Sequence, residues 1–124
     1  MEHLLQNFYS ISNLQTEENK IAATIALNPS HEIYKGHFPE VPVVPGVCQM
    51  QLVKELLSEV LKKDLVMQTA ENMKFMAVIN PMINASLDVK IDFKTTSENI
   101  VKINASIFYE ALVFFKFSGS FAQN

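Results

Sequence analysis

The residues best placed to do chemistry lie in one short stretch rich in glycine and proline. This segment covers residues 36–47 and reads GHFPEVPVVPGV, so that a histidine directly follows its first glycine. Prolines three residues apart restrict the backbone, and His37 therefore loses most of its conformational freedom before any ligand binds. Because imidazole titrates near neutral pH, His37 is a candidate general base.

A second group in the same segment complements this base. Gly46 follows His37 by nine residues and directly precedes a predicted helix over residues 47–63. A backbone N–H at a helix N-terminus is a natural donor to a developing oxyanion. A base and an oxyanion donor are two of the three groups needed to remove a proton next to a carbonyl.

The predicted helix is amphipathic and is the one convincing helix of the chain. At 100° per residue, one broad arc is apolar and the opposite arc is polar. The apolar arc contains Met50, Leu52, Val53, Leu56, Leu57, Val60 and Leu61. The polar arc contains Gln51, Lys54, Glu55, Ser58, Glu59 and Lys62.

The rest of the chain is typical of β-strands. Alternating apolar and polar residues, which mark half-buried antiparallel strands, are clearest over residues 87–94, 101–107 and 113–121. Residues 20–27 mix apolar and β-branched residues and predict a further strand, and weaker patterns predict strands over residues 8–14 and 69–79. The apolar stretch at residues 111–117 would aggregate at an exposed edge, so we expect it in the centre of the sheet or paired across a subunit boundary. We expect an α+β fold in which one long helix packs on an antiparallel sheet of five or six strands.

Composition narrows the possible functions. The 124 residues suit a single domain spanning 1–124, and no repeat or linker divides them. All ten cations are lysines and the formal net charge is −3, which argues against nucleic acid as a partner. The longest purely apolar runs have five residues, too few for a membrane-spanning helix. With no secretory signal and one cysteine, the chain is expected to be cytoplasmic.

That single cysteine and the three histidines show no metal-ligand spacing, and we predict no metal. Cys48 falls in the first turn of the predicted helix, where a thiol pKa can be lowered enough for nucleophilic catalysis. The more common role of a free cysteine is that of a small buried hydrophobe.

The motif Gly36-His37-Phe38-Pro39, followed by Pro42 and Pro45-Gly46-Val47, resembles the signature of the hot-dog-fold (3R)-hydroxyacyl-ACP dehydratases of type II fatty acid synthesis. The similarity runs from about residue 32 to the C-terminus. It implies a hot-dog fold, in which a curved antiparallel sheet wraps one central helix and two protomers join their sheets side by side. An acyl tunnel at the dimer interface would hold the substrate.

The resemblance also assigns roles to residues. His37 would remove the α-proton of a 3-hydroxyacyl thioester, and the N–H of Gly46 would polarise the thioester carbonyl. Val47 and Phe38 would lie at the oxyanion and substrate-binding positions. No cofactor is implied, because the enoyl product is conjugated with the thioester.

One position departs from the family pattern. The family has a carboxylate fourteen residues after the histidine, which gives a proton to the leaving hydroxyl, whereas this chain has Gln51. A glutamine can orient a hydroxyl or a water by hydrogen bonding but has no carboxyl proton to transfer. Glu55, one turn further along the helix, could replace it only in a rearranged site.

Three functional hypotheses therefore stand. The first is a dehydratase acting on acyl-ACP or acyl-CoA thioesters as a homo-oligomer, with His37 as base and Gln51 as orienting group. The second is a catalytically impaired acyl-binding homologue, or one subunit of a hetero-oligomer with a related hot-dog chain. The third is thioester hydrolysis, in which Gln51 would position the attacking water.

Overall fold

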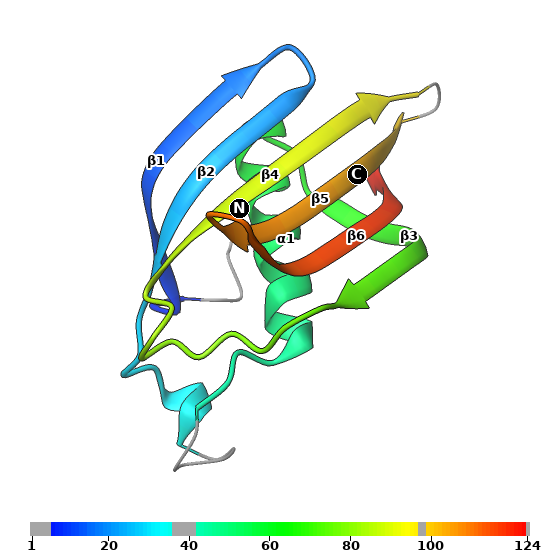
Figure 1. Ribbon diagram of the computed structural model, residues 1–124. Coiled ribbons are helices and arrows are strands. Elements are labelled where there is room, and N and C mark those ends of the chain that lie inside the picture. The colour runs from blue at the N-terminus through cyan, green and yellow to red at the C-terminus, as the bar shows by residue number, and fades with distance from the viewer. Residues whose placement is uncertain (1–5, 36–41, 97–98, 124) are drawn as a thin grey trace.

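The computed structural model describes residues 6–35, 42–96 and 99–123, which form one antiparallel sheet and one long helix (Figure 1). In chain order the elements are β1 (Tyr9–Glu17), β2 (Lys20–Leu27), the 3₁₀ turn η1 (Glu32–Tyr34), α1 (Gly46–Leu61), β3 (Leu65–Phe75), β4 (Ser86–Thr95), β5 (Ile100–Tyr109) and β6 (Leu112–Gln123).

The sheet has six strands in the order β1-β2-β4-β5-β6-β3, and every neighbouring pair is antiparallel. The chain leaves the sheet after β2, forms α1, and returns as β3 at the opposite edge. The curved sheet therefore wraps the helix (Figure 1). This is the expected hot-dog fold.

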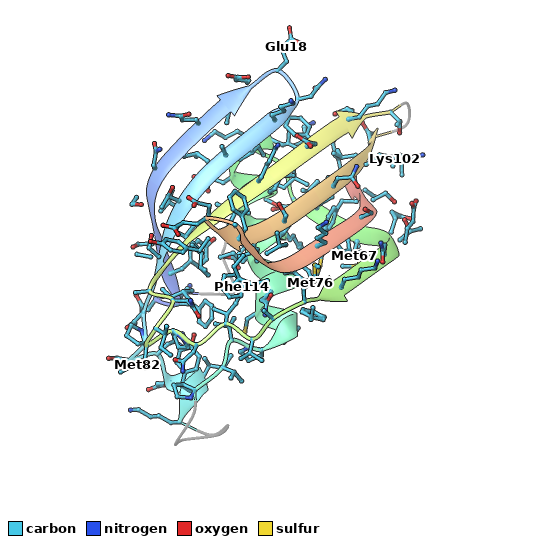
Figure 2. All side chains as sticks on the ribbon, in the orientation of Figure 1. Glu18, Met67, Met76, Met82, Lys102 and Phe114 are labelled. Carbon is cyan, nitrogen blue, oxygen red and sulfur yellow. The ribbon has the colours of Figure 1, made fainter. Side chains whose placement is uncertain are left out.

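The core lies between the helix and the inner face of the sheet. Strands β2, β4 and β5 alternate between buried apolar residues and more exposed residues, as their sequences predict. From the helix, Val53, Leu56 and Leu57 are fully buried, and β6 adds Phe115, Phe117 and Phe121. Figure 2 draws the described side chains on the ribbon and labels Phe114 of β6. Each such side chain stabilises the fold by about 1.5–3 kcal/mol relative to exposure.

The position of β6 confirms the expectation for residues 111–117. It pairs with β5 on one side and with β3 on the other, so its backbone is hydrogen-bonded along both edges. A sequence that would aggregate at an edge is thereby placed in the interior of the sheet.

The strand predicted over residues 69–79 was misplaced. β3 instead covers Leu65–Phe75, and only Leu65 is buried along it. The apolar residues that follow β3 form an irregular connection, in which the Ile79 carbonyl accepts a hydrogen bond of 2.9 Å from the Val44 N–H. Ile79 is buried there and adds to the core without belonging to a strand.

The helix begins one residue earlier and ends two residues earlier than predicted. Pro45 is its N-cap with extended backbone angles, and Lys62 is its C-cap in the left-handed conformation. Its buried surface is also wider than the amphipathic pattern indicates. Glu55 and Ser58, which the pattern assigns to the polar arc, are both buried.

Candidate active site

The residues expected to do chemistry divide between the described and undescribed parts of the chain. His37 and Phe38 lie outside the described residues, and so do Gly36 and Pro39 beside them. Gly46, Val47 and Gln51 are described, and all three lie in the first two turns of α1. The structure thus defines the helical half of the expected site.

Gly46 is the first residue of α1 and packs directly under an aromatic ring. A Cβ at this position would lie 2.7 Å from Cζ of Phe75, the last residue of β3. Only a residue without a side chain lets the ring approach so closely. The first N–H groups of a helix have no acceptor within it, so the Gly46 N–H suits the oxyanion role.

Val47 is the most exposed of the three expected site residues that the structure describes. Its exposed fraction is 75%, and the neighbouring Phe75 is 51% exposed. Both residues contribute apolar surface close to the helix N-terminus. Such surface is compatible with the expected contact to an acyl chain or to another subunit.

The segment that leads into α1 is fixed from two sides. The Val44 N–H donates to the Ile79 carbonyl, and the Val44 carbonyl accepts a hydrogen bond of 3.3 Å from Nε2 of Gln49. Gln49 is buried on the helix and therefore ties its first turn to the preceding segment. This arrangement holds the backbone that positions Gly46.

Gln51 belongs to a hydrogen-bonded chain of three side chains. Its Nε2 donates to Oε2 of Glu55 at 3.0 Å, and the Tyr9 hydroxyl donates to Oε1 of the same carboxylate at 3.0 Å. Glu55 is only 3% exposed, whereas Tyr9 and Gln51 are half-buried. Burial, followed by the charge of Glu55, raises the pKa of Tyr9, so its hydroxyl stays protonated and remains a donor.

The structure does not support Cys48 as a nucleophile. Burial raises the pKa of its thiol, and the nearby Glu55 raises it further. The thiolate is the reactive form, so both effects oppose reactivity despite the position in the first helical turn. Cys48 packs in the core as a small hydrophobe.

Two residues near the site were missed in the sequence. Tyr9 contacts Glu55 across 46 residues of chain, and Phe75 covers Gly46 from the far edge of the sheet. The aromatic character of each residue is visible in the sequence. No local pattern pairs either of them with the helix.

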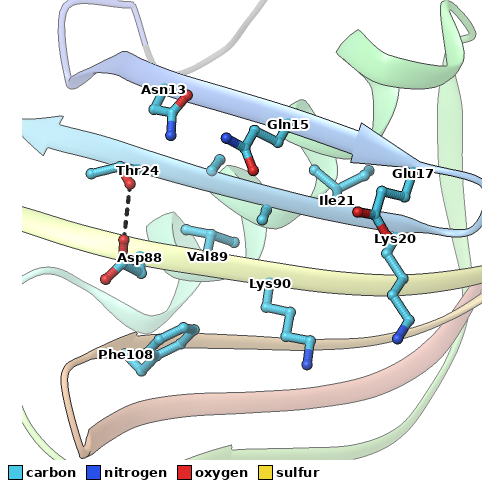
Figure 3. A pocket seen from close by; sticks show the side chains of 12 residues that line it. Asn13, Gln15, Glu17, Lys20, Ile21, Thr24, Asp88, Val89, Lys90 and Phe108 are labelled. Carbon is cyan, nitrogen blue, oxygen red and sulfur yellow. Dashed lines mark hydrogen bonds between the residues drawn. The ribbon is translucent and has the colours of Figure 1, made fainter.

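The outer face of the sheet carries a separate hollow of about 270 Å³ over β1, β2 and β4 (Figure 3). Lys20, Lys90 and Asp88 are among its lining residues, and the Thr24 hydroxyl donates to Oδ1 of Asp88 at 2.9 Å. None of the expected site residues lines this hollow.

Within the described ranges, no group of three or more histidine, cysteine, aspartate or glutamate residues could hold a metal ion. Over the same residues, no helix combines the length and apolar character needed to cross a membrane.

Comparison with known proteins gives one family match. The model of the ApeI-like family, described as ApeI dehydratase, matches residues 13–107. The 3-hydroxyacyl-[acyl-carrier-protein] dehydratase FabZ of Rickettsia akari (strain Hartford) is 29% identical over 85 residues. That alignment covers 62% of this chain and 57% of the relative, so the chain spans little more than half of the relative's length.

Solved structures share the fold at low identity. A chain of the dehydratase heterocomplex ApeI:P from Xenorhabdus doucetiae superposes with a TM-score of 0.73 at 17% identity, covering 91% of this chain and 96% of that chain. A hypothetical thioesterase with coenzyme A from Streptococcus pneumoniae TIGR4 gives a TM-score of 0.64 at 11% identity, with 94% and 85% covered.

Proposed function

Because the chain belongs to the ApeI-like dehydratase family, we propose that it eliminates water from 3-hydroxyacyl thioesters to give 2-enoyl thioesters. The observation that carries this proposal is the extent of the family match. Residues 13–107 include the whole segment from Gly36 to Val47 and all of α1. The acyl group would be presented on acyl carrier protein or on coenzyme A.

The elimination requires three events at the substrate. His37 takes the α-proton, and the electron pair of that C–H bond forms the new double bond. The N–H of Gly46 donates to the thioester oxygen, where negative charge develops. The C–O bond at the third carbon breaks, and the departing hydroxyl needs a proton to leave as water. Gln51 orients that hydroxyl but has no carboxyl proton to give.

The proton for the leaving group therefore comes from another group. In the simplest scheme, the His37 imidazolium returns the proton that it has taken from the α-carbon. General acid catalysis contributes about 10²–10⁴-fold, so a site without a dedicated acid is expected to be slow by that order.

Association with a second chain is part of the proposal. β3 lies at the edge of the sheet and is exposed along its length after Leu65. Several of its apolar side chains are exposed, including Val66, Met67 and Met73. An unpaired edge of this kind is suited to pairing with the edge of another subunit. We propose that two sheets join there, and that the protein acts in the cytoplasm.

The proposal is tested by hydration of a short 2-enoyl thioester, which is the reverse reaction. Wild-type protein and His37→Ala are compared at equal concentration, and loss of the enoyl absorbance is followed over time. We expect wild-type turnover and at least a hundredfold loss in the variant, about the contribution of a general base. Equal rates would reject the assignment. Release of free acid instead would identify a thioesterase.

A second candidate function follows from Gln51. A related subunit could supply the missing carboxylate while this chain supplies His37. The fold likeness to a chain of the ApeI:P dehydratase heterocomplex is compatible with such an assembly. Co-expression of this chain with a related hot-dog protein, followed by co-purification and the same assay, tests it. Activity found only in the mixed complex would favour this candidate.

A further inference from the structure

The orientation of the Gln51 side chain is chemically ambiguous when the residue is considered alone. A carboxamide has an acceptor oxygen and a donor nitrogen of nearly equal shape, and either end could face the substrate. A leaving hydroxyl or a bound water would meet a different partner in the two cases. Activity that depends on Gln51 therefore depends on which end of its amide is presented.

Glu55 removes this ambiguity. It follows Gln51 by one helical turn, and its Oε2 accepts from Nε2 of Gln51 at 3.0 Å. Both oxygens of this carboxylate accept hydrogen bonds, and the nitrogen end of the Gln51 amide is the end that faces it. The carbonyl oxygen of Gln51 and its second N–H are then left for other partners. Gln51 is half-buried, so part of this side chain remains accessible.

Tyr9 in turn fixes Glu55. Its hydroxyl donates to Oε1 of Glu55 at 3.0 Å. One carboxylate oxygen therefore accepts from β1, and the other accepts from Gln51 on the helix itself. Tyr9 is the first residue of β1 and lies opposite Leu27 in the ladder with β2. The preceding carbonyl, that of Phe8, accepts a hydrogen bond of 2.9 Å from the Asn28 N–H. The backbone at Tyr9 is therefore held by hydrogen bonds to β2 and to the residue that follows β2.

We propose that Tyr9 and Glu55 are positioning residues that hold Gln51 with its carbonyl oxygen available to the hydroxyl of the substrate. This inference rests on the proposed function, and it assigns two residues to the site besides the motif of residues 36–47. Neither residue needs to touch the substrate, since both act through the amide of Gln51.

Glu55→Gln is the sharpest single change, because it preserves the volume of the side chain and leaves an acceptor for Tyr9 while a donor nitrogen replaces one carboxylate oxygen. The Tyr9 hydroxyl can still donate to the carbonyl oxygen of the new amide. Where that hydrogen bond is kept, the new nitrogen faces Gln51 and donates to it, which turns the Gln51 amide around and presents nitrogen to the substrate. We expect kcat to fall about tenfold with KM nearly unchanged, as for a group displaced from its working geometry.

Two further variants complete the design. Tyr9→Phe removes the hydroxyl and is expected to lower kcat severalfold. The double exchange Gln51→Glu with Glu55→Gln keeps one carboxylate and one amide. Tyr9 can then still donate to residue 55, and residue 55 can donate to residue 51, so both hydrogen bonds of the series are possible. The double exchange places the carboxylate at the family's position, and kcat should recover to the wild-type value or above it.

Thr24→Val is the matched control. It removes another hydroxyl-to-carboxylate hydrogen bond, the one to Asp88, on the outer face of the sheet and away from α1. Its kcat should equal that of the wild type. Thermal unfolding of all variants shows whether a loss of kcat merely follows a loss of stability.

The outcomes separate the two proposals. Wild-type activity with unchanged kcat in both Glu55→Gln and Tyr9→Phe overturns this inference and leaves the dehydratase assignment standing. A fall in kcat that the double exchange does not reverse also overturns it. A wild-type protein no more active than His37→Ala rejects the proposed function, and the positioning role with it.

Discussion

Position 51 carries a carboxamide, which has no carboxyl proton to transfer. In the hot-dog dehydratases that the motif resembles, this position supplies an acid. Here it supplies a hydrogen-bonding group, and the nearest carboxylate on the helix, Glu55, is buried one turn away and bonded to it. A carboxyl group is thus present in the helix but lies one turn beyond the family's position.

Gln51→Glu is expected to create an acid from this arrangement. The new carboxyl would lie within hydrogen-bond distance of Glu55, where two acceptors can stay together only by sharing a proton. That proton would be available to the leaving hydroxyl, and the rate of hydration or dehydration should rise about 10²-fold. The gain should decline as the pH rises and the shared proton is lost, which a pH–rate profile measures.

Gln15→Glu on the exposed face of β1 is the control for the added charge, and it should leave the rate unchanged. If Gln51→Glu brings no gain in the protein purified alone, the hypothesis that a partner subunit supplies the acid is favoured.

Cys48 is expected to be chemically inert in the folded protein. The raised pKa of its thiol keeps it protonated at neutral pH and into the mildly alkaline range where an ordinary thiol ionises. Iodoacetamide should therefore alkylate it very slowly at pH 8, and rapidly once urea unfolds the chain. Mass spectrometry of timed samples gives both rates. Fast alkylation of the folded protein at pH 7 would contradict this assignment and restore the nucleophile hypothesis.

At the scale of elements, the central strands could be predicted and the edge strands less well. β2 matches the predicted residues 20–27, and β4 and β5 contain the residues whose alternation predicted them. These strands bury one face, so burial imposes a period of two on their sequences. β1 and β3 are mostly exposed on both faces, so their sequences do not alternate between apolar and polar residues in the same way.

The described part of the candidate site could also be predicted from the sequence only in part. The motif predicted Gly46 at the start of a helix, and the structure agrees. The contacts from Tyr9 to Glu55 and from Phe75 to Gly46 depend on the order of strands in the sheet, which local patterns do not encode. The burial of Glu55 was missed because a helical wheel shows which residues are polar but not which other elements pack against the helix.

Gly119 in β6 is expected to tolerate no side chain. It lies opposite Ala70 of β3, between two irregularities in the register of that pair. A Cβ here would collide with the Thr69 carbonyl oxygen and would lie 2.6 Å from Cζ of Phe117. Because a backbone oxygen cannot move without disturbing the ladder, Gly119→Ala should lower the free energy of unfolding by about 3 kcal/mol or more.

Gly46→Ala provides the comparison for Gly119→Ala. Its added methyl group meets the end of the Phe75 ring, which can shift, and the cost should be nearer 1 kcal/mol. Urea unfolding of the two variants measures both values. Equal costs would mean that β3 is not held close to β6 at this point.

At the scale of the whole molecule, the two edges of the sheet differ in character. β1 carries mainly polar residues at one edge, including Ser10, Ser12 and Asn13. β3 and the segment after it expose apolar side chains at the other edge, namely Val66, Met67, Met73, Phe75, Met76 and Val78. Exposed apolar residues that gather along one edge favour that edge for association.

Ala70→Lys tests this asymmetry directly. Ala70 is the middle residue of β3 and is exposed, so two β3 strands paired antiparallel over their full length would bring the two added lysines close together. Like charges at that position should separate the subunits, and edge lysines also oppose strand pairing in general. Analytical ultracentrifugation should then show a dimer or larger assembly for the wild type and a folded monomer for the variant. Circular dichroism confirms the fold.

Thr16→Lys places the same charge on β1 at the opposite edge and should leave the assembly intact. If Thr16→Lys dissociates the protein and Ala70→Lys does not, the sheets join through β1 and the proposed interface is wrong. The resemblance implies a site shared between two chains, so the Ala70→Lys monomer should also lose hydration activity. A monomer that keeps full activity would show that one chain forms the complete site, and that association serves another purpose.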